Sequence, residues 1–197
     1  MISFNVVLFD DFETLDAFGP VEIIGKMPKA YKLNYFSVNG DTVLSSQHIS
    51  VNTLPFSAID TSGILLIPGG IGTRRLVDDI EFIHQLKILS QEALYVLTVC
   101  TGSALLAKTG LLQGKNATSN KLAFDWVCEN GKGVNWVEKA RWIRDDKYYT
   151  SSGVSAGMDM TLGFICDIHG EKTANDICKY IEYIWNQDKD DDPFAAV

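Results

Sequence analysis

The stretch Tyr95–Gly110, with the sequence YVLTVCTGSALLAKTG, joins a short β-branched and aromatic run to a run of good helix formers. Its opening residues have the length and composition of a strand buried on both faces, and residues 103–108 favour a helix that the final glycine ends. Cys100 falls in the turn between them. A tight strand-to-helix turn needs small residues two positions on either side of its central residue, and Thr98 and Gly102 occupy these positions. The spacing therefore predicts a nucleophile elbow with a cysteine at its tip.

The position of Cys100 before a helix predicts a reactive thiol. The unpaired N–H groups and the positive dipole end of that helix would lie beside the sulfur, which lowers the pKa of a thiol and favours the thiolate. The alternative is a packing role, because free cysteine is among the most buried residue types. Motifs elsewhere in the chain are needed to decide between a reactive thiol and a packing role.

Length and composition predict a single α/β domain over residues 1–197. Hydrophobic residues make up 46% of the chain, which is sufficient for a substantial core. The formal net charge of -8 argues against a nucleic-acid or acidic-membrane partner, because binding phosphate groups requires a positive surface. Residues 1–5 lack a signal-peptide pattern, no apolar run reaches membrane-spanning length, and the cysteines form no CxxC pair. We therefore expect a cytoplasmic protein with reduced thiols, and we predict neither a metal site nor a cofactor.

Short aliphatic runs alternate with segments of helical periodicity along the chain. This alternation predicts a mainly parallel central sheet with helices on both faces. The expected strands cover residues 4–9, 33–38, 64–67, 95–99, 134–137, 140–144 and 148–151, with a hairpin within residues 42–53. The expected helices cover residues 15–27, 76–89, 103–108, 122–128, 158–168 with Ser155 as N-cap, and 177–185, and the acidic residues 188–192 are expected to be a solvated terminus.

A glycine loop follows the aliphatic run at residues 64–67. Its sequence is Pro68-Gly69-Gly70, and such glycines allow backbone N–H groups to approach a bound atom and hold a developing oxyanion. An ordinary turn is the alternative, because Gly and Pro mark turns in general.

Several motifs together resemble the ThiJ/PfpI superfamily and, within it, the isonitrile hydratases. These motifs are Leu15-Asp16-Ala17-Phe18-Gly19-Pro20, Ile67-Pro68-Gly69-Gly70, Val99-Cys100-Thr101-Gly102-Ser103 with Gly110-Leu111-Leu112, Ala117-Thr118-Ser119, Ser152-Gly153-Val154-Ser155-Ala156-Gly157, and Glu182-Tyr183 with Asp192-Pro193-Phe194. The resemblance covers nearly the whole chain. It implies a flavodoxin-like three-layer sandwich, related to class I glutamine amidotransferase domains, that acts on a small molecule as a homodimer. The same motifs occur in ligand-sensing domains of AraC-type regulators, so they indicate the superfamily more specifically than its hydratase branch.

The resemblance implies roles for individual residues. Cys100 would be the nucleophile, Asp16 the acid that contacts its sulfur, and Thr101 the threonine beside it. The backbone N–H groups of Gly70 and Thr101, with Gly69 in the same loop, would bind the oxyanion. A carboxyl group held against a thiolate tends to share one proton with it and can donate or accept that proton during turnover. Cys100 would attack the terminal carbon of an isonitrile while Asp16 protonates it, and water would convert the resulting thioimidate to an N-substituted formamide.

One position departs from the superfamily pattern. Many members carry histidine in the polar stretch after the elbow helix, and this chain has Asn120 there. The three histidines, His48, His84 and His169, are not placed near Cys100 by the sequence, so each is expected to be a surface or capping residue. The absence of this histidine argues against a protease or amidase. It does not affect the hydratase hypothesis, because that chemistry relies on the carboxyl group of Asp16.

Other residues and functions remain alternatives. A glyoxalase, a deglycase or a redox sensor could use the same thiol, and a ligand-binding regulatory module could share the fold, although no helix-turn-helix segment follows before Val197. Other side chains near the expected site have simpler roles as solvated, capping or core residues. They are Asp10, Asp11, Glu13, Glu22, Arg74, Arg75, Trp126, Trp136, Trp142 and Trp185.

Overall fold

A computed structural model describes residues 1–195 and contains one large sheet with the strand order β10-β11-β7-β6-β1-β2-β5. Its strands are β1 (Ile2–Val7), β2 (Tyr31–Ser37), β5 (Leu54–Pro55), β6 (Ile64–Ile67), β7 (Tyr95–Thr98), β10 (Trp142–Asp145) and β11 (Tyr148–Ser151). Only the β10–β11 pair is antiparallel among these described strands. The predicted mainly parallel sheet is therefore confirmed.

Two small sheets accompany the large one. The predicted hairpin is present as β3 (Thr42–Leu44) paired antiparallel with β4 (Ser50–Asn52). A second pair, β8 (Asn116–Ala117) and β9 (Asn135–Trp136), is parallel. The polar segment after the elbow helix thus contains a strand that its composition did not indicate.

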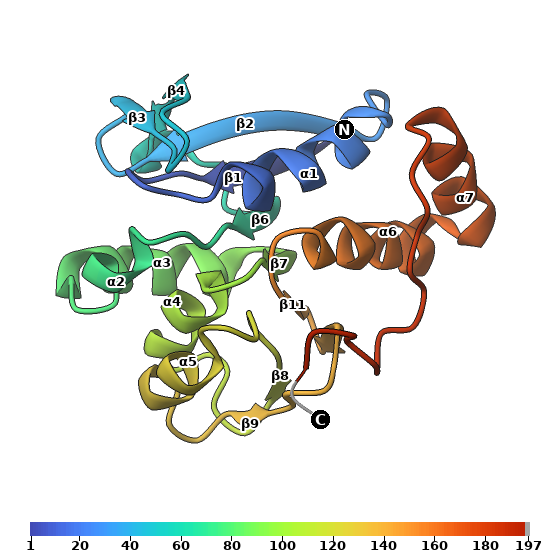
Figure 1. The fold of residues 1–197 in the computed structure, drawn as a ribbon. Coiled ribbons are helices and arrows are strands. Elements are labelled where there is room, and N and C mark those ends of the chain that lie inside the picture. Colours follow the sequence, from blue (N-terminus) through green and yellow to red (C-terminus); the bar gives the residue numbers. More distant parts are fainter. Residues whose placement is uncertain (196–197) are drawn as a thin grey trace.

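Helices cover both faces of the large sheet, as Figure 1 shows. On one face α1 packs against α6 and α6 against α7, while α3, α4 and α5 form a continuous layer on the other. The helices are α1 (Thr14–Gly25), α2 (Thr73–Leu76), α3 (Ile80–Glu92), α4 (Gly102–Lys108), α5 (Phe124–Asn130), α6 (Ala156–His169) and α7 (Glu171–Tyr180), with a 3-10 turn η1 at Phe56–Ala58. This is the three-layer sandwich that the sequence predicts.

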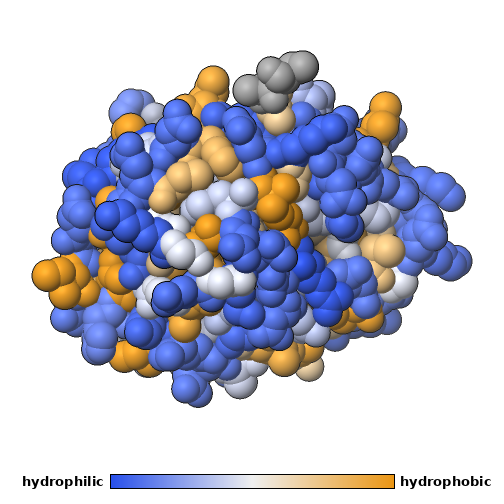
Figure 2. Space-filling view, turned by 90° about the horizontal axis from the view of Figure 1, so that it is seen from below, coloured by the Kyte–Doolittle hydropathy of each residue, from blue (hydrophilic) through white to orange (hydrophobic). Residues whose placement is uncertain are grey.

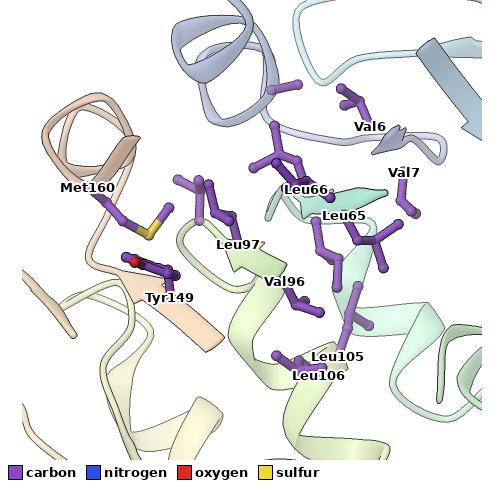
Figure 3. Packing of buried hydrophobic residues seen from close by; sticks show 14 of the residues in the cluster. Val6, Val7, Leu65, Leu66, Val96, Leu97, Leu105, Leu106, Tyr149 and Met160 are labelled. Atoms are coloured by element: carbon purple, nitrogen blue, oxygen red, sulfur yellow. The ribbon is translucent and has the colours of Figure 1, made fainter. Parts of the chain in front are cut away.

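The aliphatic runs form the core because each central strand is buried on both faces. Side chains alternate along a strand, so neighbours point to opposite layers. Figure 3 shows Leu97 and Tyr149 on the side of Met160 from α6, and Val96 on the side of Leu105 and Leu106 from α4. All of these side chains are buried. Helices on both faces are therefore anchored to the strands that lead into the elbow.

The carboxyl ends of β1, β6 and β7 meet at one edge of the sheet, where the chain switches from one side of β1 to the other. Ligands in open α/β sheets bind at such a switch point. The loops are in close contact there, because a Cβ atom added at Gly70 would lie 2.4 Å from the backbone oxygen of Asp11. The edge brings together the start of α1, the glycine loop and Cys100.

The helix predicted over residues 177–185 occupies different residues. It runs from Glu171 to Tyr180 as α7, whose buried side is formed by Ala174, Ile177 and Cys178. The following apolar residues leave the helix, and the Trp185 indole N–H donates to the backbone oxygen of Asp159. A tertiary contact has therefore overridden the local helical pattern.

The prediction of a solvated acidic terminus is also wrong for one residue. Asp192 is buried, its backbone N–H donates to the Lys139 oxygen over 2.7 Å, and its carboxylate faces Arg141. Ser155 precedes α6 as predicted, but its side chain makes no capping hydrogen bond. The motif at residues 152–157 contacts the elbow instead, through the hydrogen bond from the Cys100 N–H to the Ser152 oxygen.

The surface carries scattered apolar side chains among polar ones, as Figure 2 shows for one face. Among residues 1–195, no helix combines the length and the apolar character that crossing a membrane requires.

Candidate active site

The turn at Cys100 has the geometry predicted from the sequence. Cys100 adopts φ +56°, a left-handed conformation that is rare outside glycine, asparagine and aspartate. Its carbonyl oxygen accepts hydrogen bonds from the hydroxyls of Ser103 (3.0 Å) and Ser119 (2.8 Å), and its N–H donates to the Ser152 oxygen (3.2 Å). Three segments therefore hold the strained residue in place.

Gly102 is required for this turn. A Cβ atom at that position would lie 2.3 Å from the backbone oxygen of Ile67 and 2.8 Å from that of Pro68. The elbow and the end of β6 consequently touch backbone to backbone, which explains the small residue two positions after the cysteine.

Asp16 lies in the first turn of α1 and is completely buried. Its Oδ2 accepts a 2.9 Å hydrogen bond from the Gly69 N–H, while Oδ1 has no partner of standard hydrogen-bond geometry among residues 1–195. Burial raises the pKa of this carboxyl from 3.8 to about 7, and the charge of Glu13 adds to the rise. The Gly69 N–H and the Cys100 thiol oppose it. Asp16 is therefore poised to gain or lose a proton near neutral pH.

The Cys100 thiol has only a small opening to solvent, since the residue is 7% exposed. Burial raises its pKa above the ordinary thiol value, and the negative charge of Asp16 raises it further. Hydrogen bonds from the Thr101 N–H and hydroxyl and from the Val154 N–H lower it in part. The expectation that the helix start gives a net lowering of the thiol pKa is thus wrong, because burial and the neighbouring carboxylate outweigh the N–H groups.

Asp16 and Cys100 form one titrating pair rather than two independent groups. Each appears among the causes of the other's pKa shift, so the protonation of one group depends on that of the other. Both shifts disfavour the doubly ionised pair. Between the two pKa values the pair holds a single proton, which resides mainly on the sulfur because the thiol has the higher pKa.

Thr101 connects the elbow to the glycine loop. Its hydroxyl oxygen accepts from the Gly70 N–H (3.1 Å) and from the Thr73 hydroxyl (3.1 Å). Gly69 fits between the two sides of the site, because a Cβ atom there would lie 2.6 Å from the Thr101 nitrogen and 2.9 Å from Asp16 Oδ2.

The Gly70 N–H, which the resemblance names with the Thr101 N–H as an oxyanion donor, and the Gly69 N–H in the same loop both donate hydrogen bonds within the protein. The Gly69 N–H is engaged by Asp16 and the Gly70 N–H by Thr101. In this structure they position the acid and the threonine, whereas the Thr101 N–H points at the sulfur.

Asn120 does not replace the missing histidine chemically. Its Oδ1 accepts from the Ala123 N–H over 3.0 Å, and its amide packs against Gly153. The histidines lie elsewhere: His48 sits in the exposed β3–β4 turn, His84 is exposed on α3, and His169 contacts the Tyr31 hydroxyl at the far end of the sheet. The site among the described residues therefore consists of a thiol, a carboxyl group and hydroxyls.

The neighbouring acidic residues have separate partners. Asp10 accepts from the Leu44 N–H, Asp11 pairs with Arg75, Glu13 accepts from Gln47 and Glu22 pairs with Lys26. None of the four is among the causes of the Cys100 pKa shift, whereas Asp16 is.

Arg74 and Trp126 form a contact that the sequence did not reveal. The guanidinium carbon of Arg74 lies 3.4 Å from the ring centroid of Trp126, so the two groups stack. Arg74 is partly buried; burial lowers the pKa of its guanidinium, and the charge of Cys100 opposes this shift. It follows Thr73, whose hydroxyl contacts Thr101, and so places a positive charge near the elbow.

Val154 is the other site residue that sequence reasoning missed. It is β-branched yet adopts φ +42°, and its backbone N–H is one of the groups that lower the pKa of the Cys100 thiol in part. Its signal in the sequence is the motif at residues 152–157, which reads as a helix start. Among residues 1–195, no group of three or more His, Cys, Asp or Glu side chains is arranged to hold a metal ion.

A sequence model of the DJ-1/PfpI family matches residues 3–166, which include the elbow, the glycine loop and Asp16. The chain belongs to this family. The crystal structure of a ThiJ/PfpI family protein from Pseudomonas syringae superposes with a TM-score of 0.85 at 26% identity, covering 98% of this chain and 77% of that one.

Relatives of the chain include enzymes and regulators. It is 28% identical over 183 residues to an isonitrile hydratase of Pseudomonas putida, covering 92% of this chain and 78% of that protein. It is 26% identical over 193 residues to the HTH-type transcriptional regulator GbdR of Pseudomonas aeruginosa, covering 92% of this chain and 50% of the regulator. Membership of the DJ-1/PfpI family therefore leaves the activity to be argued from the site.

Proposed function

We propose that the protein is a small-molecule enzyme that hydrates isonitriles, with Cys100 as nucleophile and Asp16 as the group that carries the proton. The observation that carries this proposal is the buried Asp16 carboxyl, held by the Gly69 N–H beside the elbow, whose pKa of about 7 is coupled to that of the Cys100 thiol. The similarity to an isonitrile hydratase supports it.

The first half-reaction joins sulfur to carbon. The proton of the pair passes through Asp16 to the terminal carbon of the isonitrile while Cys100 Sγ bonds to the same carbon, giving a thioimidate, R–N=CH–S–Cys100. No net charge develops, because the proton and the nucleophile come from the same singly protonated pair. A buried site with few charges suits such a reaction.

The second half-reaction releases the product. Asp16 accepts a proton from water as the water oxygen bonds the thioimidate carbon, and passes that proton to the nitrogen, giving the tetrahedral adduct R–NH–CH(OH)–S–Cys100. The carbon–sulfur bond then breaks as the hydroxyl group becomes the carbonyl; its proton passes to sulfur, and an N-substituted formamide leaves. The Thr101 N–H faces the sulfur and so favours negative charge on it as that bond breaks.

The test is formamide formation from an alkyl or aryl isonitrile by the purified protein. We expect turnover in the wild type and in Cys128→Ala, a partly buried cysteine on α5, and none in Cys100→Ala. Asp16→Asn should lower the rate of thioimidate formation, which mass spectrometry of the Cys100 peptide follows directly. Absence of turnover in the wild type, or equal turnover in Cys100→Ala, would reject the proposal.

A ligand-binding module is the second candidate, because the chain spans half the length of a regulator that it resembles. In that case small molecules would raise the melting temperature without being converted, and Cys100→Ala would bind them equally well. We also propose that the protein is a homodimer, and a monomeric mass in sedimentation equilibrium would contradict this.

A further inference from the structure

The segment after α7 returns along the molecule toward β8 and α5, as Figure 1 shows. A buried charge cluster fixes its first part. Arg141 donates from Nε to Asp159 Oδ2 over 2.8 Å, and Asp159 Oδ1 accepts from the Tyr183 hydroxyl and the Asn186 N–H, both over 3.0 Å. Arg141 and Asp159 are both buried, so this anchor is not a surface contact.

A second anchor fixes the end of the described chain. Asp192 Oδ1 lies 3.6 Å from a guanidinium nitrogen of Arg141 and accepts a 3.0 Å hydrogen bond from the Phe194 N–H. The backbone of Phe194 is thus held by a buried carboxylate, whereas its side chain is 73% exposed. Phe194 therefore presents a large apolar side chain to solvent from a backbone that is held in place.

Phe194 borders a pocket of about 340 Å³ that is also lined by residues 120–122 and 152–155. This volume is within the usual range of small-molecule sites. The inner wall adjoins the candidate active site, because the oxygen of Ser152, which lines the pocket, accepts a 3.2 Å hydrogen bond from the Cys100 N–H. The fully exposed side chain of Leu122 adds apolar surface to the same pocket.

We propose that Phe194 forms the outer wall of the substrate pocket and selects substrates with an aromatic or similarly bulky apolar substituent. The substituent would lie among Phe194, Leu122 and Val154 while the reacting carbon reaches Cys100. Burying apolar surface on both partners favours this arrangement, and the anchored backbone reduces the entropy lost on binding. The identity of the reacting group rests on the proposed hydratase function, whereas the pocket and its preference do not.

The first test is independent of turnover. Cys100 is alkylated with N-phenylmaleimide and with N-methylmaleimide, and the ratio of the two rates is measured on the Cys100 peptide by mass spectrometry. Both reagents attack the same sulfur, so the ratio cancels any change in thiol pKa. Phe194→Ala should lower the preference for the phenyl reagent about fivefold, the scale of one aromatic contact.

The matched control is Ile184→Ala, which removes another exposed apolar side chain, 92% exposed against 73% for Phe194, from the same segment but outside the pocket. Its ratio should equal that of the wild type. Asp192→Asn, which weakens the anchor and keeps Phe194, should lower the ratio in the same direction. An unchanged ratio in Phe194→Ala, or an equal fall in Ile184→Ala, would overturn the inference.

The second test separates this inference from the proposed function. KM is compared for benzyl and methyl isonitrile, and Phe194→Ala should raise the benzyl value more than the methyl value, again about fivefold. Turnover with an unchanged KM ratio would overturn the pocket assignment alone. A shifted maleimide ratio without any isonitrile turnover would support the pocket and reject the hydratase.

Discussion

The Gly69 N–H donates a 2.9 Å hydrogen bond to Oδ2 of Asp16, and this bond does not offset the burial of the carboxyl group. A single N–H donor compensates only part of the desolvation of a carboxylate. The acid therefore stays partly protonated at neutral pH beside a thiol that is itself hard to ionise.

Activity should rise with pH through about 7 and then reach a plateau, because deprotonation of the Asp16–Cys100 pair to its singly protonated form creates the reactive state. A profile of kcat/KM against pH measures this. A rate that falls between pH 6 and 8 would contradict the shared-proton description.

Stability should depend on pH in the opposite sense. The pKa of Asp16 is higher in the folded state than in the unfolded chain, so the folded state binds the extra proton and loses stability as pH rises from about 4 to about 7. The full loss is roughly 4 kcal/mol as an order of magnitude. Urea unfolding at pH 5 and pH 8 should show a larger loss for the wild type than for Asp16→Asn, whose amide does not titrate. Equal losses in both would show that other groups dominate.

The backbone strain at Cys100 should appear as a difference between two inactive variants. Both Cys100→Gly and Cys100→Ala remove the thiol, but only alanine keeps a Cβ atom at φ +56°. The glycine variant should be more stable by about 1 kcal/mol, which chemical denaturation can resolve. A more stable alanine variant would show that the surrounding contacts have absorbed the strain.

The Arg141 charge cluster should be important for stability. Arg141→Ala leaves Asp159 and Asp192 buried without their cation, and it should cost about 3–5 kcal/mol. Lys172→Ala removes an exposed pair with Asp176 on α7 and should cost well under 1 kcal/mol. Urea midpoints of the two variants provide the comparison, and similar values would contradict the assigned role.

Two glycines offer a test of backbone contact at the elbow. Gly102→Ala would place Cβ 2.3 Å from the Ile67 oxygen, and it should cost about 1–3 kcal/mol or more and reduce activity. At Gly25 the nearest atom would be 3.7 Å away, so Gly25→Ala at the end of α1 should be neutral or slightly stabilising. Thermal unfolding followed by circular dichroism gives the stability of each variant. Equal losses of stability in Gly102→Ala and Gly25→Ala would disprove the steric argument.

The sequence was sufficient to predict the elements whose local residue pattern agrees with their burial in the structure. The strands at Ile64–Ile67 and Tyr148–Ser151 have the predicted bounds, because aliphatic or β-branched runs between turns have few other solutions. The elbow was also predictable from local sequence, because the tight turn at Cys100 needs small residues two positions before and after it.

The parts that were not predictable depend on contacts between distant segments. The apolar residues after α7 follow a helical pattern, but Tyr183 and Trp185 leave the helix to bond Asp159. Asp192 lies in an acidic run that is typical of a solvated tail, and only the position of Arg141 makes it buried. The direction of the Cys100 pKa shift likewise depends on burial and on Asp16, which the elbow motif does not specify.

The tight fit of Gly69 between Thr101 and Asp16 has a practical meaning for protein engineering. A library that randomises Gly69 should return glycine in nearly every functional clone, because any larger residue pushes the acid and the threonine apart. Efforts to widen the substrate range would therefore do better to vary the wall around Phe194 and to leave the floor of the site untouched.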